Sequence, residues 1–383
     1  MELINPRTFL VVALLLGLLC ALVLFVEARS YPKDIVGLDH WAAGVVLIGV
    51  ASGLLSLRDI APDFVAIVLA NTLMLAGDAF LIVGLQRFSG RPPAWRPMLD
   101  AMAAVVVLLI WLTYGSNSYQ GRIFVMAVAQ AALFAWGAWL AARAEPRGFG
   151  SRFLAGAFLF GVLAALWRIA TLPMFVDEAN DVFDRSLVQQ VYLGAFSIGL
   201  LGLAIGFILL ANEKLRVALE FLATRDPMTG ALNRRAFFAR AEVEWARAQR
   251  SHAPLAAIAS DIDFFKKVND THGHHVGDLV IKDYASRSAT MLRKPDILAR
   301  FGGEEFVVLL PDTGLADAHH VAERIRCEVE ARHDKTLPPF TVSLGIAVTR
   351  GTPHQPATLE ELLSLADEAL YRAKQGGRNR TET

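Results

Sequence analysis

The sequence has few cysteines and few charged residues, and both shortages limit what the protein can be. Its 383 residues include two cysteines, Cys20 and Cys327, too few for a disulfide framework or a cysteine metal cluster. Only 19% of the residues are charged and 54% are hydrophobic, which is too apolar for an ordinary soluble protein of this size. Acidic and basic residues are equal in number, and the charged C-terminal part has no basic cluster. This composition argues against a nucleic-acid partner.

The apolar residues are concentrated before residue 211, in seven stretches whose length suits a membrane-spanning helix. Such a helix needs about 20 apolar residues. The first stretch lacks a strongly basic start and six more follow, so we expect it to be retained rather than cleaved as a signal peptide. The stretches are Thr8–Val26, Leu38–Leu57, Phe64–Leu85, Met98–Thr113, Ile123–Ala142, Phe153–Leu172 and Val191–Ala211. Residues 1–211 are therefore predicted to form an all-α transmembrane bundle of about seven helices, in contact with membrane lipid.

Charges in the loops between these stretches predict the orientation of the bundle. Two loops are basic and the loop before the last span is acidic: Arg87, Arg91 and Arg96, then Arg143, Arg147 and Arg152, against Asp177, Glu178, Asp181 and Asp184. Loops on the cytoplasmic side of a membrane are enriched in Lys and Arg. We therefore expect the N-terminus outside and the part after the seventh span in the cytoplasm.

Three polar residues lie inside predicted spans. Asn71 and Asp78 are seven residues apart on one face of the third span, and Arg168 lies in the sixth. Such groups are costly in a membrane and often functional, but pairing between helices explains many of them, and we expect pairing here. The spans carry no His pair suited to haem, and no outer loop is long enough for a sensor domain. The hypothesis that remains is a membrane-embedded sensor of unknown stimulus.

From Asp226 onward the sequence alternates between helical and strand patterns. The expected elements are helices at Arg235–Arg250, Gly277–Leu292, Leu315–Arg332 and Leu359–Lys374, and strands at Leu255–Asp261 and Phe340–Val348. About 160 residues suffice for one core, and interleaved helices and strands predict an α/β (α+β) domain over residues 225–380. Residues 212–224, with leucines at helical spacing, predict a connecting helix that can pair with its twin.

Two glycines and two glutamates lie between short apolar runs at Ile297–Phe301 and Phe306–Leu310. The Gly302-Gly303 pair predicts a tight hairpin turn, which would hold Glu304 and Glu305 at an accessible edge. Carboxylates beside exposed backbone suit Mg²⁺, which takes oxygen ligands and often arrives with phosphates. An ordinary turn followed by solvated acids is the alternative.

A second group of polar residues begins at Asp261, which ends an apolar strand. Ligands of such sheets commonly bind at the C-terminal ends of strands. Lys266 can reach a phosphate as a flexible charge, and Asn269 with Asp278 can match the edge of a purine. Each of these residues also has an alternative interpretation without a ligand: Asp261 can simply cap the end of the strand, and Asn269-Asp270 can be a plain turn.

The order and spacing of these motifs resemble those of the GGDEF diguanylate cyclases. The similar segments are Asp226–Arg235, Asp261–Asp270, Gly273-His274, Gly277-Asp278, Gly302–Phe306 and Ala366–Asn379. The resemblance covers about Thr224 to Arg380 and says nothing about the apolar part. Glu304 stands where many members have Asp, and Met228 replaces the commoner Leu.

The resemblance implies a mostly antiparallel central sheet flanked by helices, and an enzyme that joins two GTP molecules into cyclic di-GMP with release of two pyrophosphates. It implies a homodimer with one GTP in each domain, and Mg²⁺ or Mn²⁺ as cofactor. Together with the seven apolar spans, it implies a location in the bacterial inner membrane. By the same likeness, the metal ligands are Asp261, the Ile262 carbonyl and Glu304, the GTP-binding residues are Lys266, Asn269, Asp278, Lys374 and Arg378, and the catalytic turn is Gly302, Gly303, Glu304 and Glu305.

Arg293 and Asp296 lie shortly before the glycine pair. On physical grounds they form a charged turn. Their offset from the hairpin resembles the product-inhibition site of the family, in which Arg293 would clamp phosphate or guanine and Asp296 would accept from guanine. The resemblance therefore implies feedback inhibition by cyclic di-GMP.

Three other functions remain open. The domain could bind nucleotide without catalysis, although Asp261, Glu304 and Lys374 are all present. It could regulate a transporter or channel, although the spans lack clear pairs of broken helices. It could use another nucleotide, although Asp278 favours guanine.

Overall fold

The chain divides into two units, residues 1–218 and residues 219–383. In the part of the chain that the structure describes, the first unit is built from seven long apolar helices. The computed structural model describes residues 5–172, 187–331, 336–350 and 356–383. The helices are α1 (Pro6–Ser30), α2 (Leu38–Ser56), η1 (Phe64–Leu69) continuing into α3 (Ala70–Phe88), α4 (Trp95–Ile110) continuing into η2 (Trp111–Gly115), α5 (Tyr119–Ala142), α6 (Phe149–Thr171) and α7 (Leu187–Thr224). All seven predicted spans are confirmed as helices long and apolar enough to cross a membrane. The acidic loop predicted before the last span lies outside the described residues.

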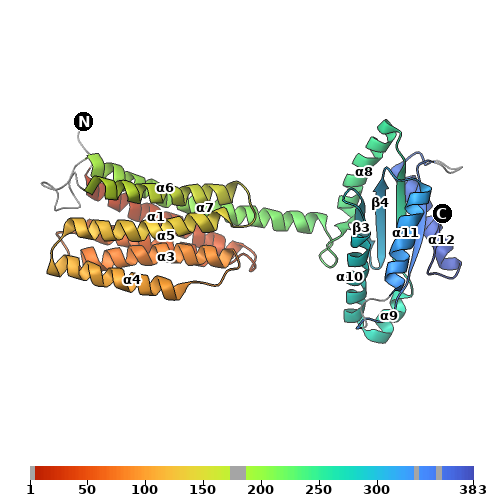
Figure 1. Cartoon of the computed structure of the whole chain (residues 1–383), viewed down its shortest axis with the longest axis horizontal. Coiled ribbons are helices and arrows are strands. Elements are labelled where there is room, and N and C mark those ends of the chain that lie inside the picture. Colours follow the sequence, from red (N-terminus) through yellow and green to blue (C-terminus); the bar gives the residue numbers. More distant parts are fainter. Residues whose placement is uncertain (1–4, 173–186, 332–335, 351–355) are drawn as a thin grey trace. The chain divides into compact units, whose positions relative to one another are not determined.

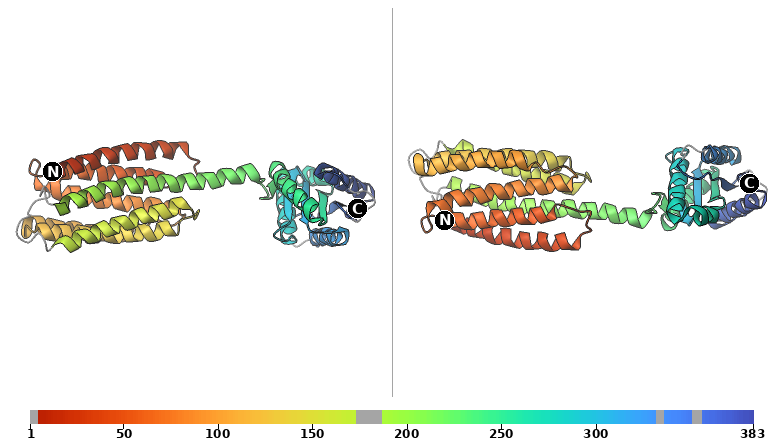
Figure 2. Two further views of the ribbon diagram at one scale, coloured as in Figure 1. Left: turned by 90° about the horizontal axis from the view of Figure 1, so that it is seen from above. Right: turned by 90° about the horizontal axis from the view of Figure 1, so that it is seen from below.

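The first three helices pack closely through glycines, and the bundle is seen from three sides in Figures 1 and 2. A Cβ atom on Gly17 of α1 would lie 3.0 Å from the Cα of Gly49 in α2. A Cβ atom on Gly44 of α2 would lie 2.8 Å from the carbonyl oxygen of Gly77 in α3. Small residues let helices in a membrane approach backbone to backbone. These contacts fix α1, α2 and α3 as a tightly packed group.

Large apolar side chains cover the outer surface of α1. Leu15, Leu19 and Leu22 are each more than half exposed. Contiguous apolar surface of this kind is rare on soluble monomers and marks contact with a membrane or another protein. The exposed leucines therefore agree with a lipid-facing helix.

A six-stranded mixed sheet forms the centre of the second unit. Its strands are β1 (Leu232–Asn233), β2 (Leu255–Ile262), β3 (Ile297–Gly302), β4 (Glu305–Pro311), β5 (Val342–Val348) and β6 (Thr381–Glu382). The spatial order is β1-β3-β4-β2-β5-β6. The three central pairs, β3 with β4, β4 with β2 and β2 with β5, are antiparallel, and only the short edge strands pair in parallel. The mostly antiparallel arrangement is confirmed.

Helices cover both faces of this sheet (Figure 1). One face packs against α9 (Phe265–His272), α10 (His274–Thr290) and α11 (Leu315–Glu330), and the other against α8 (Arg234–Ser251) and α12 (Leu359–Gln375). Side chains alternate along a strand, so Ala256 and Ile258 of β2 face the first set, and Ala257 and Ala259 face the second. β2 is buried on both faces, which explains its uninterrupted apolar sequence.

Three elements were not expected from the sequence. β1 and β6 have two residues each, too few for an alternating pattern. Helix α9 has eight residues and includes Asn269 and Asp270. The alternative of a plain turn at these two residues is therefore wrong.

Candidate active site

Asp261 lies at the C-terminal end of β2, where it is opposite Glu305 of β4 in the sheet register. By the alternation along β2, its side chain points to the face covered by α12. The Lys374 ammonium of α12 lies 2.8 Å from the Asp261 carboxylate. Burial raises the pKa of Asp261; Lys374 opposes this effect and the Glu304 and Glu305 charges add to it, so the pKa stays above its usual value. The Lys374 ammonium thus contacts Asp261, and the charges of Glu304 and Glu305 act on the same carboxyl group.

The hairpin turn lies one residue later than the glycine pair predicted. Gly302 pairs with Glu305 across β3 and β4, so the central residues are Gly303 and Glu304. Gly303 has a φ of +49°, a left-handed conformation that glycine adopts at little cost. The register shifts between Arg300 and Gly302, and this irregularity moves the turn. Glu304 therefore lies within the turn, and Glu305 begins β4.

Arg300, which sequence reasoning missed, connects this turn to the segment after α7. Its Nε donates to the Gly303 carbonyl at 2.9 Å, and its Nη1 donates to both Asp226 oxygens at 3.0 and 3.2 Å. Asp226 also accepts from the backbone N–H and hydroxyl of Thr229. Burial raises the pKa of Asp226, but the hydrogen bonds from Thr229 and Arg300 outweigh it, so the pKa is lowered. The only sequence signal was an arginine two residues before Gly302.

Asn233 joins the end of α7 to the start of α8. Its Nδ2 donates to the Ala223 carbonyl at 2.9 Å, and its Oδ1 accepts from the Ala236 N–H at the same distance. The second bond is an N-cap, which satisfies a free N–H in the first turn of α8. One side chain thus holds two helix ends.

The second carboxylate of the β2 motif, Asp263, has a structural role. It is 3% exposed and accepts from the Thr341 hydroxyl at 2.7 Å, the Ser343 hydroxyl at 2.6 Å and the Asn379 N–H at 3.0 Å. These bonds tie the end of β2 to β5 and to the loop after α12. That loop carries Arg378, whose guanidinium lies 4.5 Å from the centre of the Phe264 ring, beside the end of β2.

The two residues expected at the purine lie on neighbouring helices, Asn269 on α9 and Asp278 on α10. The Asn269 side-chain oxygen is buried and, among the described residues, has no hydrogen-bond partner. A Cβ atom on Gly277 would lie only 1.9 Å from this oxygen, so the glycine makes room for the amide. A buried acceptor of this kind can accept from a bound ligand or from an ordered water. Lys266, near the start of α9, is exposed.

Arg293 and Asp296 form a closed turn between α10 and β3. The Asp296 carboxylate accepts from the Arg293 N–H at 2.7 Å, and the Asp296 N–H donates to the Arg293 carbonyl at 3.0 Å. The Arg293 residue is exposed. The turn therefore leaves its guanidinium accessible from solvent.

The described residues include no group of three or more His, Cys, Asp or Glu side chains arranged to hold a metal ion. Asp261 and Glu304 nevertheless offer oxygen ligands, and the Lys374 ammonium stands against Asp261 where a cation fits. A Mg²⁺ site with few protein ligands takes its remaining ligands from water and substrate phosphate. The donor set therefore fits a divalent ion that binds together with a nucleotide.

Residues 223–380 match a family model described as "Diguanylate cyclase, GGDEF domain". The chain is 44% identical over 163 residues to "Response regulator PleD" of Caulobacter vibrioides, covering 41% of this chain and 35% of that protein. It is 41% identical over 231 residues to "Diguanylate cyclase DgcM" of Escherichia coli K12, covering 57% and 54%. The chain thus spans about a third to a half of the length of these relatives.

Among solved structures, the GGDEF domain of DgcB from Caulobacter crescentus in complex with c-di-GMP is 35% identical, with a TM-score of 0.38, covering 42% of this chain and 92% of that one.

Proposed function

Because residues 223–380 of this chain are a GGDEF domain, we propose that the protein is a membrane-bound diguanylate cyclase that condenses two GTP molecules into cyclic di-GMP and releases two pyrophosphates. One observation carries the proposal: Asp261 lies opposite Glu305 at the acidic turn, and the Lys374 ammonium contacts the Asp261 carboxylate. Phosphoryl transfer depends mostly on positioning and on neutralising charge, and these groups can do both.

Asp261, the Ile262 carbonyl and Glu304 would hold the divalent metal, Mg²⁺ or Mn²⁺, which when bound neutralises charge on the triphosphate. All three offer oxygen atoms, the ligands that these hard cations prefer. In this structure the Lys374 ammonium lies 2.8 Å from the Asp261 carboxylate and offsets its charge. We expect Lys374 to move from Asp261 to the phosphates when metal and nucleotide bind.

Asn269 and Asp278 would select guanine. Their oxygens are acceptors, and guanine presents N–H donors on the edge where adenine has an acceptor at N1. The unpaired Asn269 oxygen supports this role. Lys266 and Arg378 would offset the charge of the triphosphate, and the turn at Gly302 and Gly303 would let the nucleotide lie close to the backbone.

A single domain would hold one GTP, so the reaction needs two copies facing each other. The last turns of α7 carry apolar side chains suited to this pairing: Val217, Leu219, Phe221 and Leu222, all exposed in the single chain. We assign residues 1–211 to a membrane sensor with its N-terminus outside, 212–224 to a dimer connector and 225–380 to the cyclase in the cytoplasm. Arg293 and Asp296 would bind cyclic di-GMP as a feedback inhibitor, with the exposed Arg293 guanidinium as the clamp.

The test uses the purified full chain in lipid nanodiscs, with its dimeric state verified, incubated with Mg²⁺ and either GTP or ATP. We expect cyclic di-GMP and pyrophosphate from GTP and no product from ATP. Asp261→Asn should reduce the rate at least about a hundredfold because it removes a metal ligand. Glu242→Gln, on the exposed side of α8, is the matched control and should keep the wild-type rate. A verified dimer that binds GTP and makes no cyclic dinucleotide would instead support the binding-module alternative.

A further inference from the structure

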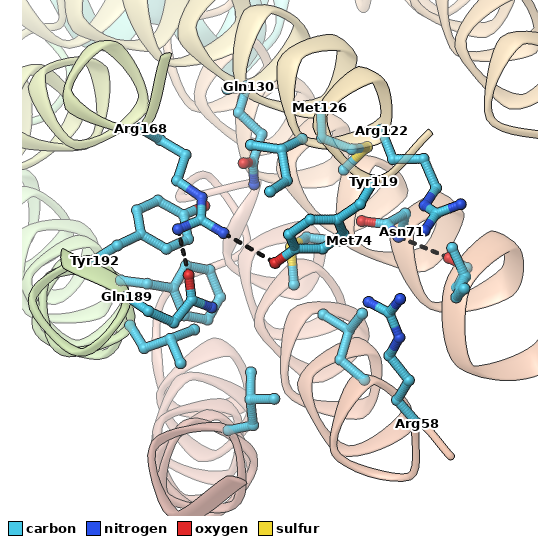
Figure 3. A pocket seen from close by; sticks show the side chains of 17 residues that line it. Arg58, Asn71, Met74, Tyr119, Arg122, Met126, Gln130, Arg168, Gln189 and Tyr192 are labelled. Atoms are coloured by element: carbon cyan, nitrogen blue, oxygen red, sulfur yellow. Dashed lines mark hydrogen bonds between the residues drawn. The ribbon is translucent and has the colours of Figure 1, made fainter. Parts of the chain in front are cut away.

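A cavity at one end of the helical bundle gathers three arginines around one tyrosine (Figure 3). It lies where α1 and α7 begin, where α2 and α6 end, and between the first turns of α3 and α5. Its volume is about 110 Å³, several times the space that one water molecule needs. Arg58, Arg122, Arg168 and Tyr119 all line it. The sequence had indicated only Arg168.

Two of these arginines are buried and hydrogen-bonded to neutral groups. Arg122 is 7% exposed and Arg168 is 6% exposed. Arg168 donates to the side-chain oxygen of Gln189 and, at 3.4 Å, to the Tyr119 hydroxyl. Arg122 donates to the Leu112 carbonyl at 3.1 Å. These bonds satisfy some of the N–H groups. Among the described residues, the charge of Asp63 acts on Arg122, but neither guanidinium lies within salt-bridge distance of a carboxylate.

Arg58 adds a third positive charge to the same space. Its guanidinium carbon lies 5.4 Å from the centre of the Tyr119 ring, and that of Arg122 lies 6.0 Å from it. Figure 3 shows Arg168 of α6 and Arg58, from the turn after α2, reaching toward Tyr119. The acid next to Arg58, Asp59, is exposed and pairs with Arg7 at 3.3 Å. Within the described ranges, none of the three cavity arginines forms an ion pair with a carboxylate.

Buried guanidinium groups need an anion. An unpaired charge is expensive in an apolar interior, and ionisable groups within a membrane protein usually face a partner or a ligand pathway. The planar guanidinium fork matches a carboxylate with two parallel hydrogen bonds. Asp78, the nearby buried acid, accepts from Gln130 and lines a neighbouring cavity rather than this one.

The rest of the cavity wall is apolar. Ile67, Met74, Met126, Leu193 and Phe196 line it. An inorganic anion would satisfy the arginines and leave this apolar surface without contacts. An organic acid with a short hydrocarbon part would use both.

From this geometry we propose that the cavity binds a small organic carboxylate, whose carboxylate group pairs with Arg58, Arg122 and Arg168 and whose hydrocarbon part packs on the apolar wall. Regulation by this ligand rests on the proposed cyclase function. The route to the enzyme starts at Gln189, which accepts from Arg168 and lies at the start of α7, the helix that runs on to Thr224. A carboxylate that recruits Arg168 would change the hydrogen bond between α6 and α7.

The binding test uses the full chain in nanodiscs of zwitterionic lipid, without nucleotide, so that its result is independent of catalysis. Isothermal titration calorimetry compares butyrate and benzoate with the neutral butyramide and benzamide and with inorganic phosphate. We expect saturable binding of at least one carboxylate, at least about tenfold tighter than its amide and tighter than phosphate. No binding of either carboxylate, equal binding of acid and amide, or tighter binding of phosphate would overturn the proposal.

Variants then locate the site. Arg168→Gln and Arg122→Gln should each weaken the bound carboxylate at least about tenfold. Ala127→Leu keeps every charge and fills the cavity, so it should also abolish binding. The matched control is Arg143→Gln at the other end of α5, where Arg143 lies over Trp139, and it should bind like wild type. Unchanged affinity in Ala127→Leu, or an equal loss in Arg143→Gln, contradicts a site in this cavity.

Cyclic di-GMP synthesis is measured last, with and without the bound carboxylate. We expect the rate to change at saturation in wild type and to stay constant in Ala127→Leu. Binding with a constant wild-type rate would refute the regulatory link and leave the site standing. Binding by a chain that makes no cyclic di-GMP at all would refute the proposed enzyme function instead.

Discussion

Replacing Gly277 by alanine separates the stability of the fold from recognition of the nucleotide. Gly277 lies within α10, and a helix interior prefers Ala to Gly by about 1 kcal/mol. The new Cβ atom would, however, lie 1.9 Å from the side-chain oxygen of Asn269. The amide must therefore move by roughly 1.5 Å to restore an ordinary contact distance. Since this oxygen is the end of a side chain, it can move without unfolding the domain.

The movement of the Asn269 amide should weaken the binding of GTP. If Asn269 accepts from guanine, the displaced amide leaves a donor of the bound base unsatisfied, which costs about 1–3 kcal/mol. This corresponds to an increase in the apparent dissociation constant for GTP of between about 5-fold and 150-fold. The free energy of unfolding of the second unit should stay equal or rise, because helix propensity offsets the displaced contact.

A double-mutant cycle provides the assay. GTP binding is measured by calorimetry on the full chain for wild type, Gly277→Ala, Asn269→Ala and the double variant. Gly277→Ala should have little further effect once Asn269 is removed, since it acts through that side chain. Gly314→Ala is the control, because nothing lies within 4 Å of its Cβ position. Additive losses, or unchanged GTP affinity in Gly277→Ala, would refute the reasoning.

Three further predictions follow from the second unit. Asp226→Asn should lower the free energy of unfolding by about 1.5–3 kcal/mol at pH 7. Folding lowers the pKa of Asp226, so this side chain stabilises the fold above the pKa of an unfolded carboxyl, and the stabilisation is lost as the pH falls through the pKa of the folded protein. Denaturant unfolding at pH 7 and at pH 3 should therefore show that the stability difference between Asp226→Asn and wild type is smaller at pH 3. Lys374→Met should raise the affinity for Mn²⁺ in the absence of nucleotide, measured by electron paramagnetic resonance, and should lower kcat/KM for GTP at least about tenfold. An unchanged Mn²⁺ affinity would show that Lys374 does not compete with the metal. Arg293→Ala should remove the plateau in progress curves at high product concentration, and a plateau at the wild-type level of cyclic di-GMP would contradict the inhibitory role.

The sequence predicted the seven helices and the central strands because the length of an uninterrupted apolar run reports burial directly. It did not predict which helix covers which end of β2, so the pairing of Asp261 with Lys374 came only from the assembled sheet. Arg300 looked like an ordinary polar position in a strand, and its contacts join residues 74 positions apart in the chain. The turn moved because of a register shift that no local pattern records.

The arginine cavity could not be predicted from the sequence either. Arg58 lies in the turn after α2, Arg122 near the start of α5 and Arg168 near the end of α6, and each alone looks like a charge at the edge of a membrane span. Only the packing of the bundle shows that they share a space. Loop charge therefore gave an expected orientation but no indication of a site.

The two hydrogen bonds of Asn233 bear on how this GGDEF domain can be transplanted. Because its side chain holds the Ala223 carbonyl and caps α8, the last turn of α7 behaves as part of the domain rather than as a spacer. A chimera that grafts another helix upstream of Ala223 should keep both bonds and still transmit a signal. One that joins at residue 225 would keep Asp226 and its bonds to Arg300 but lose the bond to the Ala223 carbonyl. Under the proposed function, synthesis of cyclic di-GMP would then continue and would no longer respond to the grafted input.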